Sequence, residues 1–235
     1  ISLKGQGAMS SSTGNTIGPL EALALVPPEI LRYLIARSKP NKAIDFDTGM
    51  GLVNLTDEFE RLSSKDFEAI EIEELSRRQR VNVEDEIGAM KMSQISHKTS
   101  TSLTFRHLAM LCQVKSDDEI IEEYGEDITE RLSRMHYWID SKHFPEEMRI
   151  VIRDSPASGL DKTYLKTLSE ALQACEWQVD TIATSIPNSI KEAGLDVKTA
   201  YYTLYQAVLG RDKGPRLAPI MVEVNRERIL ALLKP

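Results

Sequence analysis

The chain has 235 residues, a formal net charge of −7 and a hydrophobic fraction of 41%, which are ordinary values for a globular protein with a substantial core. No apolar run approaches the roughly 20 residues that span a bilayer, and the amino terminus lacks the pattern of a signal peptide, so we expect a cytoplasmic protein without a membrane partner. The two lone cysteines, Cys112 and Cys175, favour reduced core thiols over a disulfide or a metal site.

The charge is unevenly distributed along the chain. Residues 1–42 carry five bases and two acids, and residues 191–235 carry eight bases and five acids, so the acidic excess lies in the middle. Basic ends would let RNA contact selected surfaces while the acidic middle repels non-specific phosphate. The alternative is that the acids simply form solvated helix faces, and charge alone does not decide between the two.

Helix signals dominate the first half of the chain. Pro19 and Pro28 stand where a first helical turn tolerates proline, and leucines recur at three- and four-residue steps after the Thr48-Gly49 break. The helices predicted here cover about residues 19–25, 28–38, 52–62, 66–78, 84–92 and 103–114.

The second half continues the pattern with clear start and stop signals. Ser116 and Glu119 have the spacing of a capping box, Asp196 and Asn225 are suited to N-caps, and Gly210 is suited to the position after a helix. The helices predicted here cover about residues 116–125, 128–139, 161–184, 196–208 and 225–232. The run over 149–153 has some strand character but is too short to outweigh the rest, so the predicted fold is all-α.

A domain boundary is predicted near residue 95. Serine, threonine and His97 crowd together over 94–102 without apolar periodicity, and residues 154–159 have the composition of an exposed loop. We therefore expect one part over residues 1–95 and a second over residues 96–235.

A loop of small hydroxyl residues, Met9-Ser10-Ser11-Ser12-Thr13-Gly14-Asn15, is the most informative motif. Exposed backbone N–H groups and serine hydroxyls suit phosphate oxygens, although such clusters are more often linkers. The order of residues resembles the KMSKS loop of class I aminoacyl-tRNA synthetases, in the form used by class I lysyl-tRNA synthetases of the archaeal type. The stretches Pro28-Glu29-Ile30-Leu31-Arg32-Tyr33 and Ile44-Asp45-Phe46-Asp47 are also similar to that family, whereas the likeness is weaker over 105–108 and 210–217.

The resemblance implies a helical bundle or cage. Residues 1–95 would hold the loop and the stem-contact region, and residues 96–235 would be the anticodon-binding helical domain. The implied function is the carboxyl-terminal tRNA-binding part of an ATP-dependent lysine–tRNA ligase, with the lysine isoacceptor tRNA as partner.

Two absences shape this expectation. The sequence contains no His-x-Gly-His motif, and no alternating β-α pattern precedes the loop. We therefore expect a fragment whose missing nucleotide-binding fold would hold lysine and ATP with Mg²⁺. Alone, the fragment is expected to bind no cofactor and to be inactive in adenylate formation.

The site residues implied by the resemblance fall into two groups. The ATP-facing loop would consist of Ala8, Met9, Ser10, Ser11, Ser12 and Gly14. Ala8 stands where the family commonly has its first lysine and Ser11 stands at the second lysine position, so Lys4 is the nearest substitute cation. No catalytic residue is expected within the fragment.

Basic residues near the two ends, together with Arg106, are candidate tRNA contacts, because guanidinium and ammonium groups neutralise phosphates. The candidates are Arg32, Arg37, Lys39, Arg106, Arg211, Lys213 and Arg216. Recognition of an unstacked base also needs aromatic or arginine planes, which Arg106 and His107, or Tyr201, Tyr202 and Tyr205, could supply. The alternatives are core packing for each tyrosine and an ion pair with Glu29 or another acid for Arg32.

Two other candidate sites, a metal site and an acid–base pair, are rejected. His136 and His143 lack a Cys, Asp or Glu partner at ligand spacing, so no metal site is expected, and Trp138 between them favours a core face. Asp45 and Asp47 are interpreted as capping a loop rather than as an acid–base pair. Two other functions remain open: a glutamyl-tRNA synthetase-like carboxyl-terminal region, or a non-catalytic helical module that binds RNA or protein.

Overall fold

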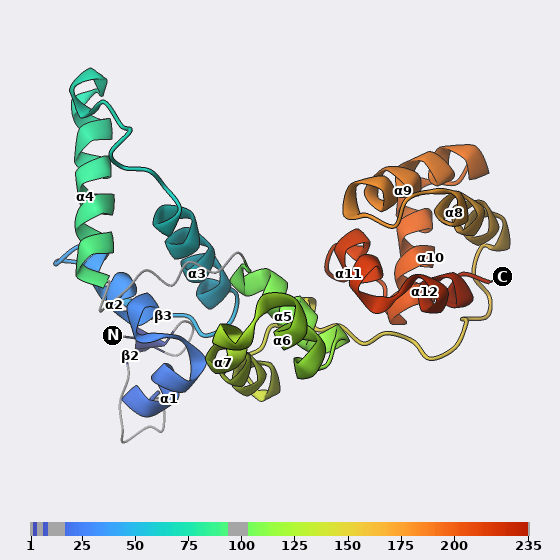
Figure 1. Cartoon of the computed structure of the whole chain (residues 1–235), viewed down its shortest axis with the longest axis horizontal. Helices are drawn as coiled ribbons and strands as arrows, with labels where there is room; N and C mark the ends of the chain where they lie inside the picture. Colours follow the sequence, from blue (N-terminus) through green and yellow to red (C-terminus); the bar gives the residue numbers. More distant parts are fainter. Residues whose placement is uncertain (1, 4–6, 9–16, 94–102, 235) are drawn as a thin grey trace. The chain divides into compact units, whose positions relative to one another are not determined.

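The computed structural model describes residues 2–3, 7–8, 17–93 and 103–234 (Figure 1). Twelve α-helices and three two-residue strands make up the regular α and β structure of these residues, which confirms the all-α prediction. The chain divides into two compact units. The first unit combines Ile1–Ala109 with Glu126–Phe144, and the second combines Met110–Gly125 with Pro145–Pro235.

The first unit is built from helices and one very small sheet. Its helices are α1 (Pro19–Leu25), α2 (Pro28–Ala36), α3 (Met50–Ser63), α4 (Arg77–Ser93), the start of α5 (Phe105–Val114) and α7 (Thr129–Asp140). Its strands are β1 (Ser2–Leu3), β2 (Gly7–Ala8) and β3 (Asp45–Phe46). Strand β1 lies in the centre, antiparallel to β2 and parallel to β3.

Trp138 is the largest fully buried side chain of the first unit. Its ring packs against Phe105 and Phe144, at centroid distances of 5.1 and 4.8 Å. Its indole N–H donates to the carbonyl oxygen of Thr48 at 2.8 Å. The prediction that this tryptophan belongs to the core is confirmed.

The predicted helix over residues 66–78 is wrong. Only a 3-10 turn, η2 (Ile72–Glu74), forms there, and α4 begins at Arg77 and continues through the valines where a join was expected. The apolar residues of this segment, Phe67, Ile70 and Ile72, are only half-buried, whereas Val83 and Met90 of α4 are buried. Ser76 and Gln79 exchange hydrogen bonds as a capping box, a start signal that the sequence analysis missed.

The second unit includes the rest of α5 and also α6 (Asp117–Tyr124). Its core lies among the last five helices (Figure 1), which are α8 (Lys162–Ala174), α9 (Val179–Ala193), α10 (Val197–Leu209), α11 (Leu217–Val224) and α12 (Arg226–Leu232). Tyr164, Leu168, Ile182 and Leu204 are fully buried where these helices meet. Helix α11 was not predicted.

The single helix predicted over 161–184 is also wrong, because α8 stops at Ala174 and α9 starts at Val179. Arg226 donates to the carbonyl oxygens of Leu172 and Gln173, at 3.2 and 2.6 Å, and so satisfies the last carbonyls of α8. A residue more than fifty positions away thus stabilises this helix end. Helix α9 then continues to Ala193.

The predicted caps are confirmed. Ser116 and Glu119 form the capping box of α6. The side chains of Asp196 and Asn225 accept backbone N–H groups at the starts of α10 and α12. Gly210 ends α10 in the left-handed region, with φ of 67°.

Both cysteines are half-buried free thiols. Burial, followed by the nearby charge of Asp117, raises the pKa of Cys112 to about 12. That thiol therefore stays protonated and unreactive at neutral pH. Among the described helices, none is both long and apolar enough to cross a membrane.

Candidate nucleic-acid interface

The small sheet joins two of the stretches that carry the family resemblance. Ala8, the last residue of β2 and the first of the signature loop, lies opposite Ser2, and Ser2 also pairs with Asp45 of β3. The other loop residues, Met9, Ser10, Ser11, Ser12 and Gly14, lie outside the described residues. The base of the loop and the Ile-Asp-Phe-Asp stretch therefore belong to one sheet, with β1 between them.

Asp47 caps helix α3. Its carboxylate oxygens accept the backbone N–H groups of Gly49 and Gly51, each at 3.0 Å. Together these bonds satisfy two donors at the start of a helix, where four lack an intrahelical partner. The cap interpretation is confirmed for this residue.

Two of the candidate basic residues in the first unit join helices to one another. Arg32 donates twice to the carbonyl oxygen of Met92, at 3.0 and 2.7 Å. It thus satisfies one of the carbonyl acceptors at the carboxyl end of α4. Among the described residues, its side chain pairs with this carbonyl oxygen and not with Glu29 or another acid. Arg106 pairs with the Asp57 carboxylate at 2.5 Å and donates to the Asn54 side-chain oxygen at 3.3 Å, which ties α5 to α3.

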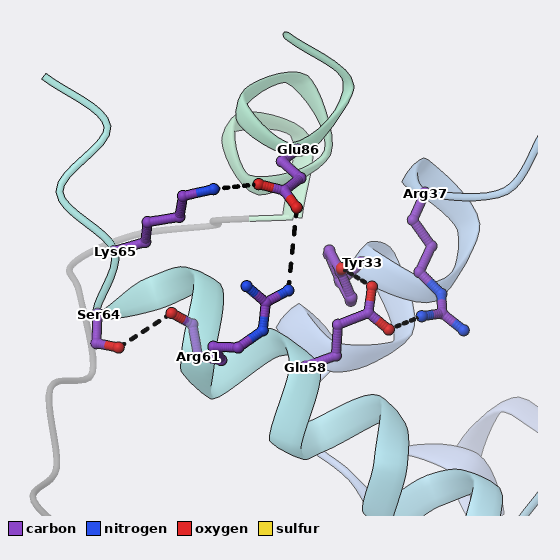
Figure 2. A network of polar contacts seen from close by, with 7 residues as sticks. All are labelled: Tyr33, Arg37, Glu58, Arg61, Ser64, Lys65 and Glu86. Carbon is purple, nitrogen blue, oxygen red and sulfur yellow. Dashed lines mark hydrogen bonds and ion pairs between the residues drawn. The ribbon is translucent and has the colours of Figure 1, made fainter. Parts of the chain in front are cut away.

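A polar network connects α2, α3 and α4 (Figure 2). Glu58 accepts from Tyr33 at 2.6 Å and forms an ion pair with Arg37, whose guanidinium also lies over the Tyr33 ring. Burial and then the hydrogen bond to Glu58 raise the pKa of Tyr33 well above its usual range. Arg37 is exposed, but its guanidinium is therefore engaged by other side chains of the protein.

The same network includes two further basic side chains, which pair with Glu86. Glu86 of α4 pairs with Lys65 at 2.6 Å and with Arg61 at 3.9 Å (Figure 2). Lys39 lies beyond the end of α2 and is exposed. Within the described parts of the chain, Lys39 has no ion-pair partner.

A shallow pocket of about 350 Å³ lies between α2, β3 and α3, with Asp45, Asn54 and Glu58 among its lining residues. No group of three or more His, Cys, Asp or Glu side chains that could hold a metal ion occurs among the residues that the structure describes. His143 instead lies 2.8 Å from the Thr48 hydroxyl through its Nδ1 atom.

In the second unit, the turn that follows α10 is fixed by its own side chains. Arg211 donates to the carbonyl oxygens of Lys213, Arg149 and Glu146, at 2.6, 2.9 and 3.1 Å. The Tyr205 hydroxyl donates to the carbonyl oxygens of Gly214 and Pro215, at 3.1 and 2.9 Å. Arg211 and Tyr205 therefore shape this turn.

Lys213 and Arg216 are exposed on the same turn. Neither side chain has a hydrogen-bond or ion-pair partner in the stretches that the structure covers. These two cations are thus presented to solvent by a turn that other residues hold in place.

Three further arginines lie around this turn and were missed by the sequence analysis. The backbone N–H of Arg153 donates to the carbonyl oxygen of Val208 at 3.0 Å, and its guanidinium lies against Gly210. Arg228 of α12 donates to the Asp154 carboxylate at 3.2 Å. The resulting basic cluster comprises Arg149, Arg153, Arg211, Lys213, Arg216 and Arg228.

The missed arginines had only a weak sequence signal. Arg149 and Arg153 flank an Ile-Val-Ile run that attracted attention as a possible strand, and no local pattern places that run beside residue 210. Among the candidate aromatic residues, Tyr201 and Tyr202 are 37% and 46% exposed on α10, whereas His107 is half-buried on α5.

Two parts of the chain match known families. Residues 1–94 match the family described as tRNA synthetases class I (K), and residues 110–234 match the anticodon binding domain. The chain is 31% identical to the lysine–tRNA ligase of Picrophilus torridus, over 98% of this chain and 46% of that protein. It is 30% identical to those of Thermoplasma volcanium and Archaeoglobus fulgidus, over 100% and 99% of this chain and 47% of each relative.

The chain thus spans about half the length of the curated relatives it matches. The two family matches cover nearly all of it, and they confirm the resemblance that the signature loop and the Ile-Asp-Phe-Asp stretch indicated. The chain therefore belongs to the class I lysyl-tRNA synthetase family, and its residues 110–234 are an anticodon-binding domain.

Proposed function

We propose that this chain supplies the tRNA-binding part of a class I lysine–tRNA ligase, which attaches lysine to its tRNA in an ATP-dependent reaction. In this proposal residues 1–95 contact the tRNA stem and residues 96–235 bind the anticodon arm. Its setting would be translation in the cytoplasm.

The observation that carries the proposal is the basic cluster of the second unit. Lys213 and Arg216 project from a turn whose backbone is held by Arg211 and Tyr205. Exposed cations on a fixed backbone suit phosphate groups, which supply most of the affinity of nucleic-acid complexes. Arg211 has internal partners, so we assign it to holding the turn rather than to contacting RNA directly.

The same reasoning ranks the candidates of the first unit. Lys39 is exposed and is our candidate for a stem phosphate. Arg32, Arg37 and Arg106 already donate to Met92, Glu58 and Asp57, so only their remaining N–H donors are available to RNA.

The nucleotide chemistry of the whole ligase is also part of the proposal. ATP, with Mg²⁺, would be attacked at its α-phosphate by the lysine carboxylate, and the loop from Ala8 to Gly14 would stabilise the leaving phosphates. The pairing of β2 with β1, and of β1 with β3, supports a fixed base for that loop. Ala8 supplies no cation at the first lysine position, so the loop would act through its backbone and hydroxyl donors.

The test is a charge-removal experiment on the chain itself. The double variant Lys213→Ala/Arg216→Ala should bind both lysine tRNA and an unrelated tRNA more weakly, because phosphates carry no sequence information. The slope of log K against log salt should become shallower by about 0.7–0.9 for each phosphate that the variant no longer neutralises. Filter binding at several salt concentrations measures both quantities.

The matched control removes two charges elsewhere in the second unit, as Lys166→Ala/Lys191→Ala on α8 and α9. This control should leave affinity and salt slope near those of the parent chain. Equal losses in the two double variants, or no loss in either, would contradict the assignment of the basic cluster to tRNA.

A further inference from the structure

Three arginines open helix α4. Arg77, Arg78 and Arg80 lie in its first turn, and all three residues are exposed. No acidic residue lies in that turn. Cations near the amino end of a helix lower its stability, because they face the positive end of the helix dipole. The stability of α4 therefore does not explain why arginine occupies these positions.

These arginines differ from the others of the first unit in their partners. Within the described residues, Arg77 and Arg78 have no hydrogen-bond or ion-pair partner, and Arg80 donates only to the carbonyl oxygen of Glu73, at 3.4 Å. The remaining arginines in the described part of this unit each have a carboxylate or carbonyl partner within it, namely Arg32, Arg37, Arg61, Arg106, Arg131 and Arg134. The three guanidinium groups at the start of α4 thus keep nearly all of their donors for a ligand.

The backbone at the start of α4 is fixed by its own capping residues. The Gln79 side-chain oxygen accepts the Ser76 backbone N–H and hydroxyl, at 3.1 and 2.6 Å, and the Ser76 hydroxyl accepts the Gln79 N–H at 3.4 Å. These bonds bracket Arg77 and Arg78. The capped turn therefore presents its guanidinium groups from a backbone that binding need not order.

Helix α4 is attached to the first unit through its other half. Glu86 pairs with Lys65 at 2.6 Å (Figure 2), and the carbonyl oxygen of Met92 accepts from Arg32. At 1.5 Å per residue, Arg77 lies about 14 Å along the helix from Glu86. Figure 1 shows the first turn of α4 at the end of the helix away from α2. The arginines thus stand at the outer end of a helix that the unit holds in place.

Acidic side chains flank this turn along the chain. Glu71, Glu73 and Glu74 precede it and Glu84 follows it, and all four are exposed. These carboxylates repel phosphate, which leaves the arginine turn as the place where an anion can approach. A contact of this size suits a few phosphates rather than a long polyanion track.

We propose that the first turn of α4 binds the phosphate backbone of a tRNA stem outside the anticodon arm, through Arg77, Arg78 and Arg80. Guanidinium groups bind phosphate oxygens with two parallel N–H donors, and RNA helices are recognised largely through their shape and their phosphates. This inference rests on the proposed tRNA-binding function, and the family match over residues 1–94 includes α4. It adds a stem contact that does not depend on the basic cluster of the second unit.

The test compares two RNAs, a whole lysine tRNA and a hairpin with the sequence of its anticodon arm. The triple variant Arg77→Ala/Arg78→Ala/Arg80→Ala should bind the whole tRNA about 10- to 100-fold more weakly than the parent chain does. Its affinity for the hairpin should equal that of the parent chain, because the hairpin lacks the contacted stem. Lys213→Ala/Arg216→Ala should weaken the binding of both RNAs.

A matched control removes three positive charges from the second unit, as Lys162→Ala/Lys166→Ala/Lys191→Ala, and should leave the affinity for the whole tRNA near that of the parent chain. The melting temperature of the arginine triple variant should be at least that of the parent chain, because the variant removes cations from the amino end of a helix. Arg77→Gln/Arg78→Gln keeps polar side chains and the Arg80 hydrogen bond, and it should weaken binding of the whole tRNA by a smaller factor.

The outcomes are distinct. Equal affinities of the arginine and lysine triple variants for the whole tRNA, with Lys213→Ala/Arg216→Ala still weakening the complex, overturn this inference and leave the proposed function standing. A loss for the hairpin as large as that for the whole tRNA also overturns it, because the contact would then lie on the anticodon arm. Failure of the parent chain to bind the whole tRNA overturns both. If the triple variant does not fold, weaker binding of the whole tRNA alone by Arg77→Gln/Arg78→Gln supports the inference, and unchanged binding overturns it.

Discussion

The side chain of Asp47 occupies the space that a β-carbon on Gly51 would need. The β-carbon, carboxyl carbon and one carboxylate oxygen of Asp47 are the nearest atoms to that position. The close approach is what allows the same carboxylate to accept the Gly51 N–H at 3.0 Å. The cap of α3 therefore requires glycine at residue 51.

Gly51→Ala should lower the free energy of unfolding by about 1–3 kcal/mol, because the methyl group displaces Asp47 from the backbone donors it caps. Urea denaturation followed by circular dichroism measures the change.

Gly88→Ala provides the matched control, since Gly88 also lies within a helix but has no atom within 4 Å of its would-be β-carbon. Alanine is the better helix former, so this variant should gain about 0.5–1 kcal/mol. Destabilisation of both variants by similar amounts would show that steric overlap with Asp47 is not the cause.

Arg211→Ala should destabilise the second unit by about 1–3 kcal/mol, because the carbonyl oxygens of Arg149 and Glu146 lose a charged donor. Lys213→Ala should change stability by no more than about 0.5 kcal/mol, since its side chain is exposed. Thermal unfolding of the two variants tests the contrast. A melting temperature of Arg211→Ala equal to that of Lys213→Ala would contradict a structural role for Arg211.

Trp138→Phe should cost about 1–3 kcal/mol, because it removes the N–H donor to Thr48 and leaves a space between Phe105 and Phe144. Its neighbour Tyr137 is 47% exposed, so Tyr137→Phe should remain within about 0.5 kcal/mol of the parent. Chemical denaturation of both variants gives the two values, and comparable losses would rule out the packing explanation.

Asp196 links the stability of α10 to pH. The backbone N–H of Thr199, and then its hydroxyl, lower the pKa of this carboxyl below its usual value. The ionised form therefore stabilises the fold above about pH 4, the usual value, and this contribution disappears as the pH falls through the lower folded-state pKa.

Asp196→Asn keeps a capping oxygen but cannot titrate, so its stability should fall less than that of the parent between about pH 4 and pH 2. Urea midpoints measured at several pH values across this window provide the comparison. Identical acid sensitivity in the two proteins would exclude Asp196 as a source of it.

The sequence could predict those parts of the fold that depend on neighbouring residues. Asp196, Asn225 and the Ser116 capping box cap their own helices, and Gly210 ends the helix that precedes it. The break between α8 and α9 was not predicted. The carbonyl oxygens at the end of α8 are satisfied by Arg226, which comes from another helix, so no neighbouring residue marks the break.

For the candidate interface, too, the sequence could predict only part of the site. Charge and the resemblance pointed to Arg211, Lys213 and Arg216 as one group. The sequence could not separate them, since the acceptors of Arg211 at residues 146 and 149 lie more than sixty positions away. Recognising Arg153 required knowing that its segment runs beside the end of α10.

The turn after α10 reaches its final geometry before any partner arrives. Gly210 begins the turn in the left-handed conformation, and the Tyr205 hydroxyl donates to the carbonyl oxygens of residues 214 and 215. Arg211 connects the turn to the segment before α8 by its hydrogen bond to residue 146. Lys213 lies between these attachment points, so binding RNA would restrict its side chain without also ordering its backbone. A preorganised turn of this kind loses little conformational entropy on association, and the encounter with a polyanion can proceed at a rate set by long-range attraction rather than by loop rearrangement.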